Sequence, residues 1–361
     1  AKKLKAKRTV ARISNSELLT SRNREMFKEL GVDDLVCPER IAAKEITNLL
    51  NYTVATDFFD FSEGLLTMYL IRLEADSPVI NRSVRALTQT YKTLQVRIAA
   101  VLRNGITIIP HAEFVFEQGD LAYLISRPNQ MDIVKQVAGK HDYTIRNLMI
   151  AGGGRIGRLA AQTLEDKLKV TLIDENRRRC EELSAALNHT LVLHGDATDM
   201  ELMKNEGLAS ADAFVAVTNS SETNVLTCLH ARRLGVKRTI ALVENTGFIN
   251  LSQDIGIDTI INKKLITASY IARLIVDGDA VRSKWLTGTN AEVIEFEVAR
   301  RSAATRNMLG ELGLPQGANV GGIIRGRETI VPTRDTQIIE GDRVVVFTLP
   351  KVADEVAKLF K

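Results

Sequence analysis

The sequence predicts an α/β protein with a Rossmann-like, doubly wound parallel sheet, present as one complete and one partial copy, each followed by a small α+β domain. Three observations support this prediction. Short runs rich in Val, Ile, Leu and Thr alternate with segments of helical periodicity, a glycine-rich turn joins one such run to a helix, and parts of the chain repeat. Strands that alternate with helices at this rhythm form a parallel sheet with helices on both faces.

The composition favours a globular protein of more than one domain. Of its 361 residues 45% are hydrophobic and 25% are charged, with a formal net charge of +4. Basic and acidic residues alternate rather than form a stripe, so we expect no nucleic-acid partner, and the basic run 1–8 is interpreted as a solvated helix end. No apolar run reaches the ~18 residues that span a bilayer. Three widely spaced cysteines fit a reducing cytoplasm, and no spacing of ligands predicts a metal site.

The chain contains an internal duplication with two parts in the same order. Residues 1–15 resemble 231–245, residues 31–50 resemble 256–275, and residues 107–126 resemble 329–348. Because the first copy begins at the position that matches Ala231, it lacks a glycine loop, and we expect a truncated first nucleotide-binding repeat. The predicted domains are a partial first Rossmann-like N-domain (1–55), a first α+β C-domain (56–142), a second, complete N-domain (143–282) and a second C-domain (283–361).

The elements of the second copy follow one another regularly. Strands are predicted at 147–152, 169–175, 190–196, 211–218, 238–245 and 258–263, with helices at 155–167, 176–188 and 222–235. From 291 onward, strands and a Gly-rich hairpin predict an antiparallel sheet with a final helix at 351–360. The predicted helix 263–281 is apolar around most of its circumference, which indicates a second buried face packed on the other copy. The alternative is an ordinary core helix with a few exposed aliphatic residues.

A glycine motif marks the candidate nucleotide site. Gly152, Gly154 and Gly157 form Gly-x-Gly-x-x-Gly between a predicted strand and a predicted helix. This pattern needs a positive φ at the first glycine, close approach of a pyrophosphate at the second and tight helix packing at the third. The helix that starts near Arg155 would present free N–H groups to the phosphates. A glycine turn without a ligand is the alternative interpretation.

Polar residues follow the neighbouring strands at the same predicted sheet edge. Asp174 lies near the ~20-residue separation at which a carboxylate binds adenosine ribose, and its charge would repel a 2′-phosphate, which favours NAD over NADP. Asp174 could equally cap the next helix. Asp196 and Thr198 are interpreted either as ligand contacts or as turn and cap residues, and Thr218 with Asn219 follows the fourth strand.

The sequence offers no catalytic group beside the expected nicotinamide. A dehydrogenase needs a proton donor or base there, and neither a Tyr-x-x-x-Lys pair nor a Ser-His-Asp arrangement is evident. We therefore expect a protein that is not an enzyme, in which the nucleotide is a signal. The alternatives are an NAD-dependent oxidoreductase with a C-terminal substrate domain and a bare oligomeric scaffold.

The motifs IAGGGRIG, LIDEN, HGDAT and AVTNSSETN, together with the duplication, resemble the tandem RCK/KTN domains of the TrkA family, the peripheral regulatory subunits of Trk potassium-uptake systems. The resemblance covers essentially the whole chain. It implies a cytoplasmic protein on the inner face of the plasma membrane that binds NAD(H) or ATP/ADP, gates an integral membrane potassium-translocating subunit, assembles as a dimer or tetramer and catalyses no reaction.

The resemblance also implies the nucleotide residues. An Arg that the family often carries on the fifth strand is Arg12 in the partial copy, whereas the complete copy has Leu242 there and Glu244 two residues on. The implied set is Gly152, Gly153, Gly154, Arg155, Ile156, Gly157, Asp174, Asp196, Ala197, Thr198, Thr218, Asn219, Glu244 and Arg12.

Overall fold

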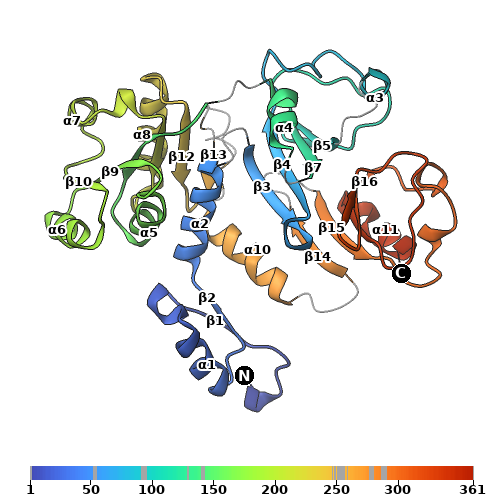
Figure 1. Cartoon of the computed structure of the whole chain (residues 1–361), viewed down its shortest axis with the longest axis horizontal. Helices are drawn as coiled ribbons and strands as arrows, with labels where there is room; N and C mark the ends of the chain where they lie inside the picture. The colour runs from blue at the N-terminus through green and yellow to red at the C-terminus, as the bar shows by residue number, and fades with distance from the viewer. Residues whose placement is uncertain are drawn as a thin grey trace. The chain divides into compact units, whose positions relative to one another are not determined.

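The computed structural model describes residues 2–51, 55–90, 96–127, 130–139, 143–245, 247, 249, 257, 259–275, 280–285 and 291–360. The chain forms two compact units, each of which combines parts of both copies (Figure 1). The first, here called the Rossmann unit, comprises Ala1–Thr53 and Tyr143–Ile275. The second, the α+β unit, comprises Val54–Asp142 and Val276–Lys361.

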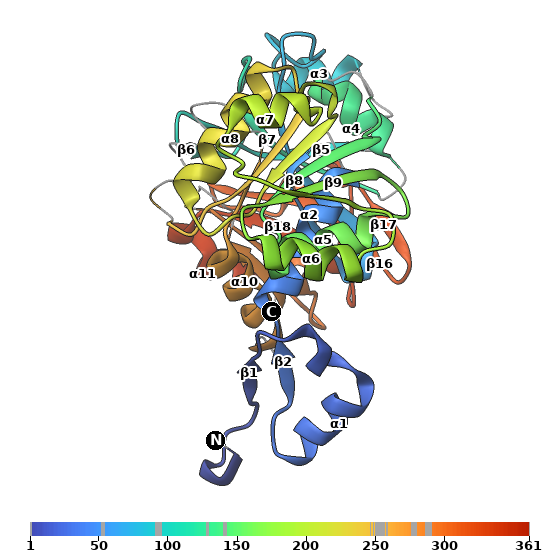
Figure 2. The same cartoon turned by 90° about the vertical axis from the view of Figure 1, so that its left-hand side faces the viewer.

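The Rossmann unit contains a six-stranded parallel sheet of order β10-β9-β8-β11-β12-β13. Numbered along the chain, this is the doubly wound order 3-2-1-4-5-6, which places the switch point between β8 and β11. Helices α7 and α8 lie on one side of the sheet and α5 and α6 on the other (Figure 2). The strands are β8 (Asn147–Ala151), β9 (Lys169–Asp174), β10 (Leu191–His194), β11 (Ala213–Ala216), β12 (Arg238–Leu242) and β13 (Thr259–Ile261), and the helices are α5 (Arg155–Leu164), α6 (Arg177–Ala186), α7 (Met200–Asn205), α8 (Ser221–Arg233) and α10 (Lys263–Ile275).

The partial copy joins the same unit through a helix. Strands β1 (Val10–Arg12) and β2 (Asp34–Val36) pair in parallel, and α1 (Ser21–Glu29) lies between them in the sequence. Helix α2 (Pro38–Asn51) packs against both α5 and α10. The apolar side of α2 is buried, with Ile46 fully inaccessible. Pairing of the two copies, predicted from the apolar helix of the second copy, is present here as the contact between α2 and α10.

The predicted helix 263–281 is wrong at its carboxyl end. Helix α10 is described to Ile275, residues 276–279 lie outside the described residues, and residues 280 and 281 belong to strand β14 (Ala280–Trp285). The β-strand forms because Ala280 and residues 282–285 pair with β15 in an antiparallel sheet, a partner that helical periodicity does not reveal. The α+β unit includes Val276–Lys361, and the predicted division into four domains stays a prediction.

The α+β unit holds two five-stranded antiparallel sheets of equivalent order, β3-β4-β7-β5-β6 and β14-β15-β18-β16-β17. This equivalence follows from the duplication, because corresponding strands take the same places. Their bounds are β3 (Ala55–Phe61), β4 (Leu66–Arg72), β5 (Val96–Arg103), β6 (Ile106–Ile108), β7 (Leu121–Ser126), β15 (Glu292–Glu297), β16 (Ala318–Arg325), β17 (Glu328–Ile330) and β18 (Arg343–Thr348), with helices α3 (Val84–Thr90), α4 (Met131–Ala138) and α11 (Ala353–Phe360).

One hydrophobic core joins these two sheets. Phe61, Leu66 and Ile125 of the first sheet share it with Phe347 of the second. A Cβ on Gly322 would collide with the Leu66 side chain, so the Gly-Gly pair of β16 permits close packing of the two sheets. The glycines of this hairpin therefore have a structural role.

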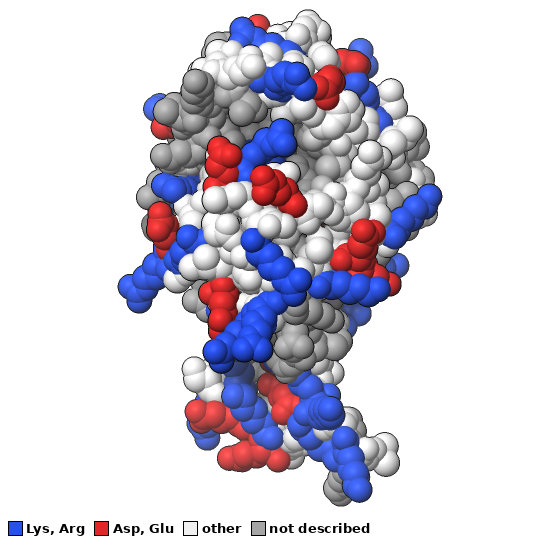
Figure 3. All heavy atoms as spheres, turned by 90° about the vertical axis from the view of Figure 1, so that its right-hand side faces the viewer, with Lys and Arg blue, Asp and Glu red and all other residues white. Residues whose placement is uncertain are grey.

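The surface displays mixed charge. Figure 3 shows Lys and Arg interspersed with Asp and Glu on the face in view. Among the described residues, no helix is both long enough and apolar enough to cross a membrane.

Candidate functional site

The glycine loop follows β8 and is fixed by the backbone. Gly152 adopts φ +106°, and a Cβ on it would lie 2.8 Å from the Thr218 nitrogen. A Cβ on Gly157 would collide with the Gly152 carbonyl oxygen. These two glycines are therefore required by the fold itself, as the motif predicts.

Gly154 has a different environment. It is the N-cap of α5 in an extended conformation, makes no side-chain capping bond, and a Cβ on it would meet nothing within 4 Å. Helix α5 therefore begins with N–H groups that no cap side chain satisfies. Nothing in the described fold requires glycine at this position.

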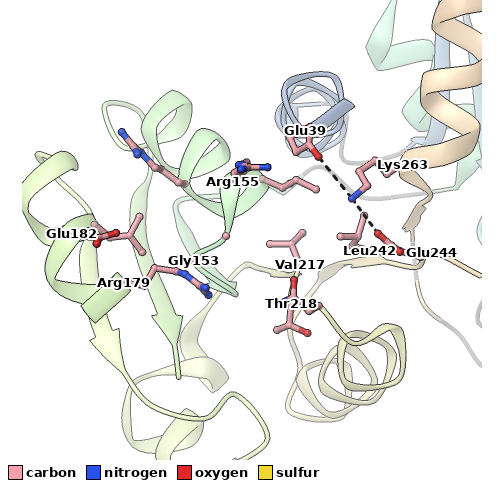
Figure 4. Close-up of a pocket in the computed structure, with 15 residues that line it drawn as sticks. Glu39, Gly153, Arg155, Arg179, Glu182, Val217, Thr218, Leu242, Glu244 and Lys263 are labelled. Carbon is pink, nitrogen blue, oxygen red and sulfur yellow. Dashed lines mark ion pairs between the residues drawn. The ribbon is translucent and has the colours of Figure 1, made fainter. Parts of the chain in front are cut away.

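A cavity of about 680 Å³ opens beside this loop (Figure 4). Its size suits a ligand of nucleotide dimensions. Of the predicted residues, the lining includes Gly153, Gly154, Arg155, Ile156, Thr218, Asn219 and Glu244, and it adds Glu39, Arg158, Arg179, Glu182, Leu183, Val217, Leu242 and Lys263. The predicted residues outside this lining are Gly152, Gly157, Asp174, Asp196, Ala197, Thr198 and Arg12.

Asp174 ends β9 with its side chain only 4% exposed. Its Oδ2 accepts the Gly153 N–H at 2.7 Å and its Oδ1 accepts the Asn176 N–H at 2.9 Å. The Arg179 Nη1 lies 3.1 and 3.2 Å from the two oxygens. Asn176, not Asp174, supplies the side-chain cap of α6, because its Oδ1 accepts the Arg179 N–H.

Cys180 follows Arg179 in α6 and is buried. Its Sγ lies 3.3 Å from the Asp174 carbonyl oxygen. Burial and the Asp174 carboxylate raise the pKa of the Cys180 thiol, which keeps it protonated and unreactive.

A buried amide ties the ends of β11 and β12. The Asn224 Oδ1 accepts the Thr218 N–H at 2.9 Å and the Thr218 hydroxyl at 2.7 Å, and its Nδ2 donates to the Leu242 carbonyl at 2.9 Å. The two hydrogen bonds between Asn224 and Thr218 hold Thr218 at the cavity wall. Sequence reasoning did not identify Asn224, although an Asn in the first turn after the fourth strand was a usable signal.

The segment after β10 forms a turn. The Asp196 Oδ1 accepts the Thr198 N–H at 2.8 Å, and Asp199 caps α7 through the N–H groups of Glu201 and Leu202. The turn interpretation accounts for the side-chain contact described for Asp196. Asp196, Ala197 and Thr198 do not line the cavity.

The first copy contributes a charge to the cavity of the second. Glu39, in the first turn of α2, has a side chain 10% exposed, and its Oε1 lies 3.9 Å from the Lys263 Nζ, which is 3.1 Å from the Glu244 Oε1 (Figure 4). Arg12 lies 3.9 Å from the same Glu39 oxygen. Glu39 and Lys263 were not predicted, but the alignment of 31–50 with 256–275 places both at the start of corresponding helices.

The described residues contain no cluster of three or more His, Cys, Asp or Glu that could hold a metal ion. The polar groups that line the cavity are instead three arginines, one lysine, three glutamates, Thr218 and Asn219. Such a lining suits an anionic organic ligand with hydroxyl groups.

The sheet order and the glycine loop at its switch point define a Rossmann-type protein with duplicated α+β domains. The family model of the TrkA-N domain matches residues 148–263, and that of the TrkA-C domain matches 68–138 and 293–361. The chain belongs to the TrkA family, which confirms the resemblance seen in its motifs.

Two relatives illustrate this membership. The chain is 30% identical over 356 residues to the Trk system potassium uptake protein TrkA homolog 1 of Methanosarcina mazei, covering 98% of this chain and 79% of the relative. It is 31% identical over 359 residues to the Trk system potassium uptake protein TrkA of Vibrio alginolyticus, covering 98% and 78%.

Solved structures support the fold. The GsuK RCK domain gives a TM-score of 0.55 at 18% identity, covering 98% of this chain and 75% of that chain. The GsuK channel bound to NAD gives 0.54 at 18% identity, covering 98% and 62%. The predicted Rossmann-like α/β class is confirmed.

Proposed function

We propose that this chain is a nucleotide-binding regulatory subunit that gates a membrane potassium-uptake system, with NAD(H) or ATP/ADP as signal. The curated relatives are Trk system potassium uptake proteins, and the fold is shared with a channel solved with NAD. Its partner is an integral membrane subunit of Trk type, which holds the chain, as a dimer or tetramer, at the cytoplasmic face of the membrane.

Gly154 carries the nucleotide part of this proposal. It lines the cavity, yet its φ of −63° is open to any residue and a Cβ would touch nothing within 4 Å. Gly152 and Gly157, by contrast, cannot hold a Cβ without collision. A glycine without a reason in the fold, at the position where a pyrophosphate approaches the backbone, supports a phosphate ligand.

The electrostatics of the loop favour the same ligand. The N-terminus of α5 carries about half a positive charge and free N–H groups. Arg155 and Arg158 line the cavity from the first turn of this helix. A diphosphate would therefore meet backbone donors and two guanidinium groups.

The lining favours a signal over a reactant. The described lining residues include no His, Tyr or Cys. The other lining groups that can transfer a proton are held in ion pairs: Lys263 with Glu39 and Glu244, and Glu182 with Arg178. This composition disfavours the alternative, an NAD-dependent oxidoreductase with a C-terminal substrate domain.

Glu39 couples ligand binding to the packing of the two copies. Glu39 belongs to the partial copy and lines the cavity of the complete copy. The affinity of a ligand in this cavity therefore depends on how α2 packs on α5. A nucleotide shifts an equilibrium only by binding one arrangement more tightly than another. Two nucleotides that differ in charge near Glu39, Lys263 and Glu244 would bias the packing differently.

Potassium uptake tests the proposal. Cells that lack their own peripheral Trk subunit receive the cognate membrane subunit with the wild-type chain, with Gly154→Ser, or with Gln162→Ala, an exposed position on α5 outside the cavity. We expect Gln162→Ala to behave as wild type and Gly154→Ser to lose the response of uptake to cellular nucleotide levels. Equal uptake by all three would contradict nucleotide gating.

A further inference from the structure

Arg179 covers the carboxylate that a nucleotide ribose would need. We propose that Arg179 competes with the ribose hydroxyls for Asp174 and, once displaced, faces a 2′-phosphate, so that it sets both the affinity and the 2′-selectivity of the site. This inference rests on the proposed nucleotide function and specifies how the same cavity chooses its ligand.

The Asp174 carboxylate already accepts hydrogen bonds at both of its oxygens. The backbone N–H groups of Gly153 and Asn176 already bind one oxygen each, and Arg179 bridges both oxygens at 3.1 and 3.2 Å. An ionised carboxylate has about four acceptor positions, and its side chain here is 4% exposed. A ribose diol, which donates two O–H groups, therefore needs the positions that Arg179 occupies.

The second step is the shape of the cavity. Arg179, Glu182 and Leu183 line it, whereas Asp174 does not. The Arg179 side chain is 40% exposed, so it is free to leave the carboxylate for solvent. In Figure 4 its guanidinium extends from α6 toward the glycine loop.

The third step is that Arg179 differs from its neighbours in α6. Arg177 pairs with Glu181 at 3.5 Å and Arg178 with Glu182 at 3.2 Å, and their side chains are 82% and 89% exposed. Neither lines the cavity. Arg177 is therefore a control of the same residue type and charge in the same helix.

Removal of Arg179 should change the affinities for the two kinds of ligand in opposite directions. A 2′-hydroxyl ligand exchanges the Arg179 N–H bonds to Asp174 for O–H bonds, so removing Arg179 removes a competitor. A 2′-phosphate is repelled by Asp174 but gains a guanidinium, which binds phosphate through two parallel N–H bonds. The Asp174 charge alone, from which the sequence favoured NAD over NADP, therefore does not settle the selectivity.

Two nucleotides that differ only in the 2′-phosphate test this inference. Calorimetric titration of the full chain with 5′-AMP and with adenosine 2′,5′-bisphosphate compares wild type, Arg179→Gln and Arg177→Gln. We expect Arg179→Gln to tighten AMP binding about two- to tenfold, as for a half-exposed ion pair, and to weaken bisphosphate binding by a similar factor. Arg177→Gln should shift both ligands less than about twofold and in the same direction.

The outcomes separate the two proposals. Weaker AMP binding by Arg179→Gln, or an unchanged ratio of the two affinities, would overturn the competition and leave nucleotide binding intact. No binding of either nucleotide to the wild-type chain would overturn this inference, whereas the proposed function, whose ligands carry a diphosphate, is tested separately with ADP and NADH. Arg179→Lys, which keeps the charge without the planar fork, provides a second variant and should lie between wild type and Arg179→Gln for the bisphosphate.

Discussion

Replacing Gly154 by Ser separates the needs of the fold from those of the ligand. The substitution adds a Cβ and a hydroxyl at the N-cap of α5, where a Cβ meets no protein atom within 4 Å and φ is −63°. The same atoms would project into the cavity that Gly154 lines. The variant therefore fills the ligand position without disturbing the backbone.

The expected change in stability is small and favourable. Serine caps a helix better than glycine by a few tenths of a kcal/mol, and loss of glycine restricts the unfolded chain by a further ~0.4–1 kcal/mol. We expect the free energy of unfolding to rise by roughly 0.6–1.4 kcal/mol.

The expected change in binding is large and unfavourable. A side chain at this position displaces the phosphates from one or two loop N–H groups, each of which contributes about 1.5–3 kcal/mol to a charged acceptor. The dissociation constant for ADP or NADH should therefore rise by roughly 10- to 25,000-fold.

Urea unfolding and calorimetric titration of the same preparations measure the two effects. A variant that binds as tightly as wild type, while folding normally, would refute the argument that Gly154 exists for close approach of a ligand. A variant that unfolds more easily would refute the claim that no protein atom needs this glycine. Gln162→Ala should change neither quantity appreciably, because Gln162 is exposed and outside the cavity.

Three further predictions concern the fold. Gly152→Ala should lower the free energy of unfolding by about 1–3 kcal/mol, since φ is +106° and the new Cβ would lie 2.8 Å from backbone atoms; urea denaturation measures it, and no loss would contradict the geometry. Gly322→Val should lower the unfolding temperature of the α+β unit, because the side chain would enter the Leu66 packing; overpacking typically costs about 1–3 kcal/mol. The third is acid sensitivity: burial raises the pKa of Glu165, but bonds from the His189 N–H, the Thr190 hydroxyl and the Asn188 N–H outweigh it and lower the pKa below 4.5. A carboxylate whose pKa is lower in the folded state stabilises the fold at pH values above its unfolded-state pKa, and this stabilisation is lost as the pH falls. Stability should therefore decline below pH 4.5. The Glu165→Gln variant, compared with wild type by pH-dependent denaturation, should show a shallower decline.

Local patterns predicted the sheet and its loop well. The alternation of strands with helices and the glycine spacing are properties of short segments, and the structure places Gly152, Gly153 and Gly154 at the switch point of the six-stranded sheet. The duplication predicted that each copy contains the same two parts in the same order, and the two α+β sheets have matching strand orders.

Side-chain contacts between distant segments were beyond the sequence. The apolar helix 263–281 predicted that the two copies pack together, but it did not show that Glu39 would approach Lys263 across that packing. The run of three arginines after Asp174 did not reveal which one turns inward, because the register of α6 depends on its Asn176 cap. Residues 280 and 281, the first two of β14, were predicted as helix because the partner with which this strand pairs lies on β15.

The central claim is that the cavity beside Gly154 binds a nucleotide, and thermal unfolding of the full chain with NAD⁺, NADH, ATP, ADP and NADP⁺ at matched concentrations tests it most directly. A ligand that binds only the folded state at 100 times its dissociation constant adds about 2.7 kcal/mol, or roughly 5–10 °C for a unit of this size. The account predicts such a rise with NAD(H), ATP or ADP, and its loss in Gly154→Ser. An unfolding temperature that none of the five nucleotides changes would contradict it.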